Sequence, residues 1–238
     1  MDFNAKNFRY TTMPFETFAK QVNKSSRVYL RALSADSPAD QPARLDQDFP
    51  ALASDFILPQ KLSTCMDNMH SSVLRVSGPV NMWLHYDVMA NVYCQIRGSK
   101  RMLLFPPSDV TRLAFAPGAS SSSIDVFGSL NGPTLAGTHP WEADLRPGDV
   151  LFLPPLWLHT ATPSSNVSIA VNVFFRNLES GYAAGRDVYG NRDLAAYEKG
   201  RQEIARIVNA FGKVPADARQ FYMLRLADEL AHKASGGD

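Results

Sequence analysis

The sequence lacks most of the features that mark secreted, membrane-spanning or strongly basic proteins. Two cysteines among 238 residues cannot build a disulfide framework, and no apolar run approaches the roughly 20 residues of a membrane span. The opening Met-Asp-Phe-Asn-Ala-Lys run has neither the basic nor the apolar region of a secretory signal. A formal net charge of +1 gives no chain-wide attraction for polyanions, although a local basic patch stays open. We therefore expect no membrane association and a cytoplasmic location, with a nuclear one as the alternative.

The composition is that of a folded chain of ordinary polarity. Hydrophobic residues make up 45% and charged residues 20%, so a chain of this length can bury a core without disulfide or metal staples. Residues 1–70 combine a helical pattern at 14–22, a strand-like run at 27–31 and a connector rich in proline, aspartate and alanine. We interpret residues 1–70 as an α/β lead-in that packs on the main domain.

The middle of the chain, residues 71–178, predicts a β-rich domain. Short apolar runs separated by turn residues are typical of an antiparallel sandwich or barrel, and they occupy residues 73–76, 82–86, 91–96, 101–105, 150–153 and 168–175. Residues 97–100, Arg-Gly-Ser-Lys, predict a hairpin turn between two of these strands. Residues 115–139, with four consecutive serines, predict an exposed insertion that is either a solvated loop or a lid.

The last part of the chain, residues 179–238, predicts two amphipathic helices. Apolar residues recur at helical spacing on both sides of Gly212-Lys213-Val214, and Pro215 suits the first position of the second helix. The apolar positions are Ile204, Ile207, Val208, Phe211, Met223, Leu226, Ala227 and Leu230. We expect this helical pair either to pack on the barrel or to form a homodimer interface.

Two imidazoles and one carboxylate form the candidate metal site. Alternate residues of a strand project to the same face, so His85 and Asp87 can point inward together while Tyr86 points outward. His159 follows an apolar strand and the rigid Pro154-Pro155 pair, and it can supply a third ligand. Two histidines and one carboxylate are the ligand set of non-haem iron(II) sites with open positions, and zinc is the main competitor.

Five stretches together resemble the JmjC family of iron(II)- and 2-oxoglutarate-dependent oxygenases over most of residues 28–176. They are His85-Tyr86-Asp87, Asn91, Gly98-Ser99-Lys100-Arg101, Leu104-Phe105-Pro106-Pro107 and the run from Gly148 to His159. The resemblance implies a mainly β protein with flanking helices, built on a double-stranded β-helix, the jelly-roll or cupin-like barrel, with the C-terminal helical pair added. It also implies Fe(II), 2-oxoglutarate as cosubstrate, and dioxygen.

The resemblance assigns roles to six residues. His85, Asp87 and His159 match the metal ligands and hence the catalytic centre, while Lys100, Tyr29 and Asn91 match the residues that bind 2-oxoglutarate. A lysine suits the distal carboxylate of a dicarboxylate, and the other two would add orienting hydrogen bonds. Four further residues have two interpretations each. Asn172 is either a pocket residue or a buried side chain that satisfies backbone groups, and Arg75 is either a pocket or a phosphate contact. Trp83 and Trp157 are either walls of the pocket or stacking partners of a substrate base.

Within the JmjC family the fit is closest to the branch that hydroxylates a hypermodified guanosine of phenylalanine tRNA in wybutosine biosynthesis. Residues 29–33 and 83–91 carry this closer match. Residues 185–193 resemble the last domain of multidomain fungal proteins in which a methyltransferase and a propeller come first, so we expect an excised domain of a longer chain. The alternatives are a protein side-chain hydroxylase and a catalytically silent dimerisation or docking domain beside a methyltransferase.

Overall fold

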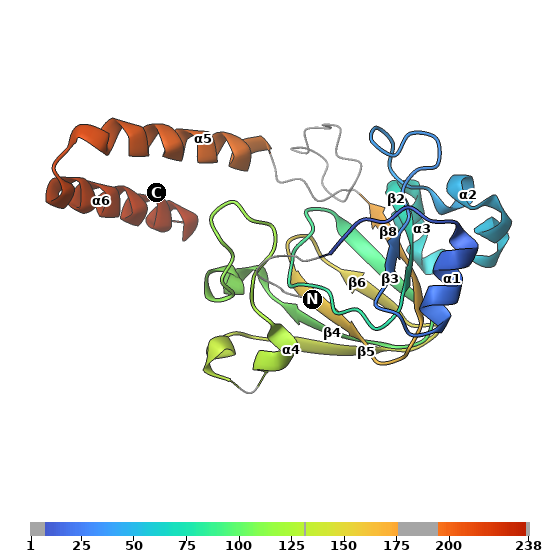
Figure 1. Ribbon diagram of the computed structural model, residues 1–238. Helices are drawn as coiled ribbons and strands as arrows, with labels where there is room; N and C mark the ends of the chain where they lie inside the picture. Colours follow the sequence, from blue (N-terminus) through green and yellow to red (C-terminus); the bar gives the residue numbers. More distant parts are fainter. Residues whose placement is uncertain (1–7, 131, 176–194, 237–238) are drawn as a thin grey trace. The chain divides into compact units, whose positions relative to one another are not determined.

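The computed structural model describes residues 8–130, 132–175 and 195–236 (Figure 1). The chain forms two compact units, residues 1–193 and residues 194–238, and each is described by itself. The sequence run 185–193, which carries the resemblance to the fungal proteins, lies outside the described residues.

The first unit is built on two antiparallel sheets (Figure 1). One sheet has the strand order β1-β2-β8-β3-β6 and the other the order β5-β4-β7. The mainly β, jelly-roll class with flanking helices that the sequence predicts is confirmed. The strands are β1 (Tyr29–Arg31), β2 (Met69–Ser77), β3 (Ala90–Arg97), β4 (Lys100–Phe105), β5 (Trp141–Leu145), β6 (Val150–Leu153), β7 (Leu158–Pro163) and β8 (Ser168–Phe175).

The predicted hairpin at residues 97–100 is wrong, because β3 and β4 belong to different sheets. β3 pairs with β6 and β8, whereas β4 pairs with β5 and β7. The turn therefore carries the chain from one sheet to the other. Gly98 has a φ of 72° and lies so close to the carbonyl of Val167 that a Cβ would collide with it, which explains the glycine.

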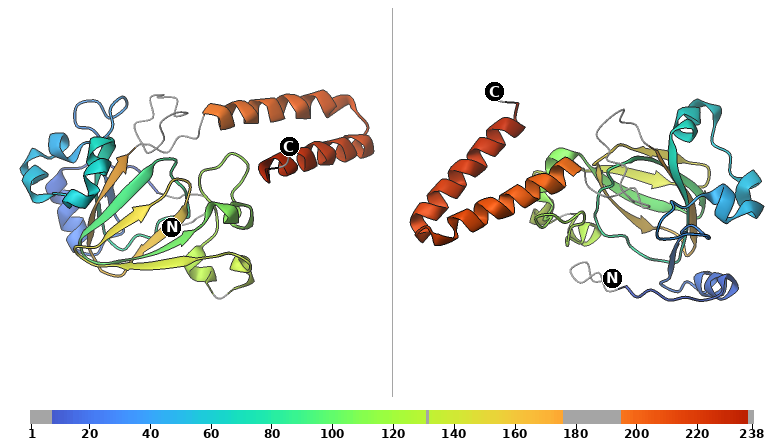
Figure 2. Two further views of the ribbon diagram at one scale, coloured as in Figure 1. Left: turned by 180° about the vertical axis from the view of Figure 1, so that it is seen from behind. Right: turned by 90° about the horizontal axis from the view of Figure 1, so that it is seen from above.

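Short helices cover the outer face of the five-stranded sheet (Figure 2). Phe18, Val22, Leu45 and Cys65 from these helices pack in one buried cluster with apolar residues of β2, β3 and β8. The helix predicted at 14–22 and the strand within 27–31 are both present. The covering elements are α1 (Phe15–Asn23), α2 (Leu45–Asp48), η1 (Pro50–Asp55), η2 (Gln60–Leu62) and α3 (Ser63–Asp67).

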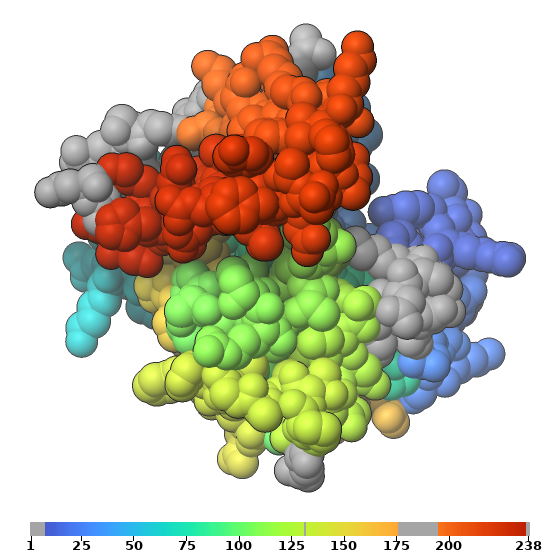
Figure 3. Space-filling view, turned by 90° about the vertical axis from the view of Figure 1, so that its left-hand side faces the viewer, coloured from blue at the N-terminus to red at the C-terminus, as the bar shows by residue number. Residues whose placement is uncertain are grey.

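The prediction that residues 115–139 form an exposed insertion is wrong for part of the segment. Val126 and Leu135 are buried in a second core with Leu84 and Leu113, and Ser122 is also buried. The segment covers much of the face of the first unit that is seen in Figure 3. Its described residues therefore fold as a flap that packs on the rest of the first unit. The short helices of the segment are α4 (Val126–Ser129) and η4 (Pro133–Leu135), and η3 (Pro107–Arg112) precedes it.

Residues 82–86, predicted as a strand, have no regular strand assignment, although they run beside β7. His85 and His159 exchange both backbone hydrogen bonds, which in a regular ladder would place Trp83 opposite Ala161. The amide of Met82, and not that of Trp83, donates to the carbonyl of Ala161, so the register of the pairing shifts by one residue. His85 is therefore held by isolated bridges to His159 and Ser121.

The second unit is a helical hairpin of α5 (Ala195–Ala210), η5 (Phe211–Lys213) and α6 (Ala216–Ala234). The two predicted helices are thus present, and Pro215 is the N-cap of α6. Neither helix buries a residue, and Ile204, Phe221 and Leu224 are more than half exposed. Among the described helices, none combines the length and the apolar character that a membrane crossing requires.

Candidate metal centre

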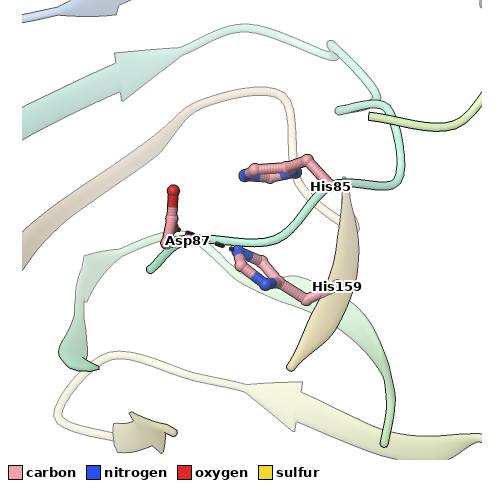
Figure 4. A group of neighbouring side chains, drawn as sticks. All are labelled: His85, Asp87 and His159. Carbon is pink, nitrogen blue, oxygen red and sulfur yellow. Dashed lines mark ion pairs between the residues drawn. The ribbon is translucent and has the colours of Figure 1, made fainter. Parts of the chain in front are cut away.

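The structure brings His85, Asp87 and His159 together. One ligand atom from each side chain lies within 4.8 Å of the other two, and the side chains point toward one another from two segments of the chain (Figure 4). His85 and Asp87 lie in the irregular stretch between β2 and β3, and His159 is the second residue of β7. The alternation expected of a strand places His85 and Asp87 on the same side despite the slipped pairing.

The backbone fixes the two histidines relative to each other. The amide of His85 donates to the carbonyl of His159 at 3.0 Å, and the amide of His159 donates back at 2.7 Å. The ring centroids are 4.3 Å apart as a result. On the other side, the amide of Ser122 donates to the carbonyl of Leu84 at 2.9 Å, so the flap and β7 hold the His85 segment between them.

Backbone carbonyls set the tautomer of both imidazoles. Nδ1 of His85 lies 3.0 Å from the carbonyl oxygen of Trp83, and Nδ1 of His159 lies 2.9 Å from that of Trp157. A carbonyl can only accept, so each Nδ1 carries a proton, and in the neutral ring Nε2 keeps the lone pair. Burial, and after it the neighbouring His159, lower the pKa of His85 to about 4, which keeps this imidazole neutral. Nε2 of His159 lies 3.6 Å from a carboxylate oxygen of Asp87.

A strained turn connects β6 to the His159 strand. Leu156 has a φ of 64°, which is uncommon for a residue with a Cβ, and Pro155 before it suits the first corner of the turn. The amide of Leu156 donates to the carbonyl of Asp87 at 2.8 Å. The strained conformation of Leu156 thus aims its amide at the backbone of Asp87 and fixes the position of that residue.

The cluster opens into a cavity lined by two cationic side chains, the buried Lys100 and the partly buried Arg75. The cavity contains about 530 Å³ free of protein atoms, part of it open to solvent, and Arg75, Lys100 and Tyr29 line it beside the three cluster residues. Burial, and after it the charge of Arg75, lower the pKa of Lys100 to about 8. Asp87 is the single carboxylate among the lining residues, so the protein groups leave the cavity with an excess of positive charge.

Arg75 has a larger part in the site than the sequence indicated. Its Nη1 donates to the hydroxyl of Tyr29 at 2.6 Å and its Nε donates to Oδ1 of Asn172 at 3.0 Å. Two of its five N–H donors are used there, so the guanidinium has donors left for a ligand. A charged residue inside the apolar run Val73-Leu74-Arg75-Val76 was the signal in the sequence.

The other predicted residues take different places. Tyr29 and Lys100 line the cavity, as the resemblance implies, whereas Asn91 is 1% exposed and is not among the lining residues. Asn91 instead accepts a hydrogen bond from Nδ2 of Asn172 at 3.1 Å and so holds that cavity residue in place. Trp83 and Trp157, predicted as pocket walls, do not line the cavity either. Their backbone carbonyls accept hydrogen bonds from the two histidines.

Comparisons with known proteins agree with this geometry. A family profile described as a cupin-like domain matches residues 1–181. The chain is 68% identical to tRNA wybutosine-synthesizing protein 4 of Neurospora crassa over 99% of this chain and 20% of that protein. It is 35% identical to tRNA wybutosine-synthesizing protein 5 of Danio rerio, covering 98% of this chain and 74% of that protein, and 33% identical to the human protein of that name.

The chain spans about a fifth of the length of the fungal relatives it matches. Among solved structures, a variant of oxalate decarboxylase from Bacillus subtilis aligns over 46% of this chain and 21% of its own, at 17% identity and a TM-score of 0.31, a likeness too slight to inform the site. The family match covers well over half of the chain, and the match to the Danio rerio protein covers most of both chains. The chain therefore belongs to the cupin-like, JmjC-type domain family, in the group that includes tRNA wybutosine-synthesizing proteins 4 and 5.

Proposed function

We propose that this chain is an Fe(II)- and 2-oxoglutarate-dependent hydroxylase that acts on a wybutosine-type hypermodified guanosine in phenylalanine tRNA. The observation that carries the proposal is the cluster of His85, Asp87 and His159 in the lining of a cavity that Lys100 and Arg75 also line. The names of its relatives support the pathway. The proposal also takes the chain to be a cytoplasmic domain of a longer protein, with the exposed apolar residues of α5 and α6 as a homodimer contact.

The donor set fits iron. In their neutral form both imidazoles offer an Nε2 lone pair to a metal ion, and the three donors leave open positions on an octahedral ion, whereas a structural zinc site would close with a fourth protein ligand. When bound, iron supplies the oxidation of the substrate by dioxygen, coupled to decarboxylation of the cosubstrate. His85, Asp87 and His159 hold that ion, and the buried surroundings keep bulk water away from it.

The charge of the cavity fits a dicarboxylate. Asp87 offsets one charge of a divalent ion, and the positive charges of Lys100 and Arg75 then suit a dianion such as 2-oxoglutarate. We assign the distal carboxylate to Lys100 and Tyr29. Arg75 orients the Tyr29 hydroxyl through its 2.6 Å hydrogen bond and supplies a charge that does not titrate near neutrality. A substrate base can reach such a cavity from a single-stranded anticodon loop, where it is unstacked.

The proposal is tested by following succinate and product together. The purified chain is loaded anaerobically with Fe(II) and given 2-oxoglutarate, air, and either tRNA from a strain lacking this protein or a pool of peptides. We expect succinate to form with the tRNA, and the modified nucleoside to gain the mass of one oxygen atom. Matched reactions without Fe(II) should give neither. Succinate formation with the peptides and not with the tRNA would make the chain a protein hydroxylase.

Lys100→Ala is expected to raise the KM for 2-oxoglutarate by about tenfold to a hundredfold while iron binding is retained, because a buried charge that pairs with a ligand is lost. Arg101→Ala is the matched control, since Arg101 is the next residue of β4 but forms an exposed ion pair with Glu142. Measured kinetics and iron content should show an unchanged KM in the control. An unchanged KM in Lys100→Ala would mean that Arg75 alone holds the carboxylate.

Cosubstrate affinity is expected to fall at alkaline pH. The pKa of Lys100 lies at about 8, below the ordinary value of 10.5, so its ammonium is charged below that pH and neutral above it. Anaerobic titration should therefore show the Kd for 2-oxoglutarate rising by about tenfold for each pH unit above 8, since the free protein must first take up a proton. Lys100→Arg, whose guanidinium stays charged, should remove this dependence. A flat profile in the wild type would contradict the role of Lys100.

A further inference from the structure

A short aromatic and basic run, Phe8-Arg9-Tyr10, lies exposed beside the candidate metal centre. Tyr10 is 93% exposed and Phe8 is 42% exposed, and Arg9 between them is exposed as well. Phe8 stacks on Trp83 with ring centroids 5.5 Å apart and an interplanar angle of 21°. Tyr10 meets Phe8 edge-on at 5.3 Å and 89°. The three rings therefore form one connected aromatic platform.

Trp83 connects the platform to the chain segment that lines the cavity. The residue before Trp83, Met82, lines the cavity, and the carbonyl of Trp83 accepts the hydrogen bond that orients the imidazole of His85. Phe8 covers the ring of Trp83, while Tyr10 stands almost wholly in water. Large exposed rings are common singly, but Tyr10 packs on Phe8, which in turn stacks on a ring of the segment that carries His85, and Arg9 adds a cation beside it.

We propose that Tyr10, supported by Phe8 and Trp83, stacks on the nucleobase next to the one that enters the cavity, and that Arg9 contacts the RNA phosphate backbone. This inference rests on the proposed function, because it takes RNA as the substrate. Aromatic faces accept any unstacked base, and an interleaved cation follows the backbone, as in single-strand-binding proteins. The platform thus supplies the local attraction for RNA that the near-neutral charge of the whole chain does not.

The test measures RNA affinity by fluorescence anisotropy, with a labelled stem that carries the single-stranded anticodon loop of phenylalanine tRNA. Tyr10→Ala should weaken binding by about tenfold, whereas Tyr10→Phe, which keeps the ring, should bind like the wild type. Arg9→Gln should weaken binding and reduce the salt slope by about one unit. Trp141→Ala is the control, because Trp141 is a 65% exposed aromatic residue on β5 and outside the platform.

A second probe locates the contact. When the loop base beside the reacting guanosine is replaced by an abasic site, Tyr10→Ala should cause no further loss, because the two changes remove the same contact. Two results would overturn the inference and leave RNA hydroxylation standing. One is an equal loss of affinity by Tyr10→Ala for the intact and the abasic loop, and the other is wild-type affinity of Tyr10→Ala for the intact loop.

Anaerobic titration of Fe(II) and 2-oxoglutarate distinguishes failure of the platform inference from failure of the proposed function. Tyr10→Ala should bind both like the wild type, since Tyr10 does not line the cavity. If the wild type bound iron and cosubstrate but no RNA, both the platform and the tRNA substrate would be rejected while the metal centre would survive. Binding of a peptide to the platform, lost in Tyr10→Ala, would assign it to a protein substrate and likewise overturn the inference.

Discussion

His159→Ala is expected to abolish turnover, lowering kcat by on the order of a thousandfold or more, because the two remaining ligands hold iron poorly and the open face of the site is no longer defined. Asp87→Ala should behave in the same way. His159 also fixes the His85 segment through its backbone, and that bridge survives the side-chain change. Measured iron content should therefore fall together with kcat while the circular dichroism spectrum stays that of the folded protein.

His139→Ala is the matched control for His159→Ala. His139 is also an imidazole beside a carboxylate, with Nδ1 2.9 Å from an oxygen of the buried Asp109. Its ring is 69% exposed, and it is not part of the metal cluster. Iron content and kcat should stay at wild-type values in this variant. Near-wild-type turnover of His159→Ala at limiting iron would remove the basis of the metal assignment.

The metal cluster could be predicted because it depends on local rules. His85 and Asp87 share a face through strand alternation, and this holds even though the stretch is not a regular strand. His159 needed only the strand and turn that precede it. The cationic wall of the cavity was harder to predict, because Arg75 and Asn172 meet across 97 residues of sequence through the pairing of β2 with β8. A single sequence contains no rule that pairs those two strands.

The sequence pattern likewise does not predict how the strands divide between the two sheets. A glycine turn between two apolar runs predicts a hairpin, and the same turn serves here as a connection between sheets because both neighbours of β3 are other strands, β6 and β8. The packed part of residues 115–139 was missed for a related reason. Its serines suggest a loop, but Val126 and Leu135 find a partner in Leu84, a residue of the metal-binding segment.

Leu84 connects that second core to the metal centre. Leu84, the residue before His85, is fully buried. Its side chain packs in one cluster with Leu103, Val126 and Leu135. The segment that carries His85 has no regular strand pairing, so isolated bridges and this buried side chain determine its position. The flap thus supports the segment that carries His85.

Leu84→Ala is expected to lower the free energy of unfolding by about 3 kcal/mol, through lost burial and the cavity left behind. It should also weaken iron binding by about tenfold, an effect of the size seen when residues that orient metal ligands are changed. Leu103→Ala is the matched control, because Leu103 is 2% exposed in the same cluster but lies on β4. Denaturant unfolding should show a similar loss in both variants, with iron affinity reduced in Leu84→Ala alone. An equal fall in iron affinity in both variants would show that the metal centre responds to the stability of the whole core, and that Leu84 has no separate part in positioning His85.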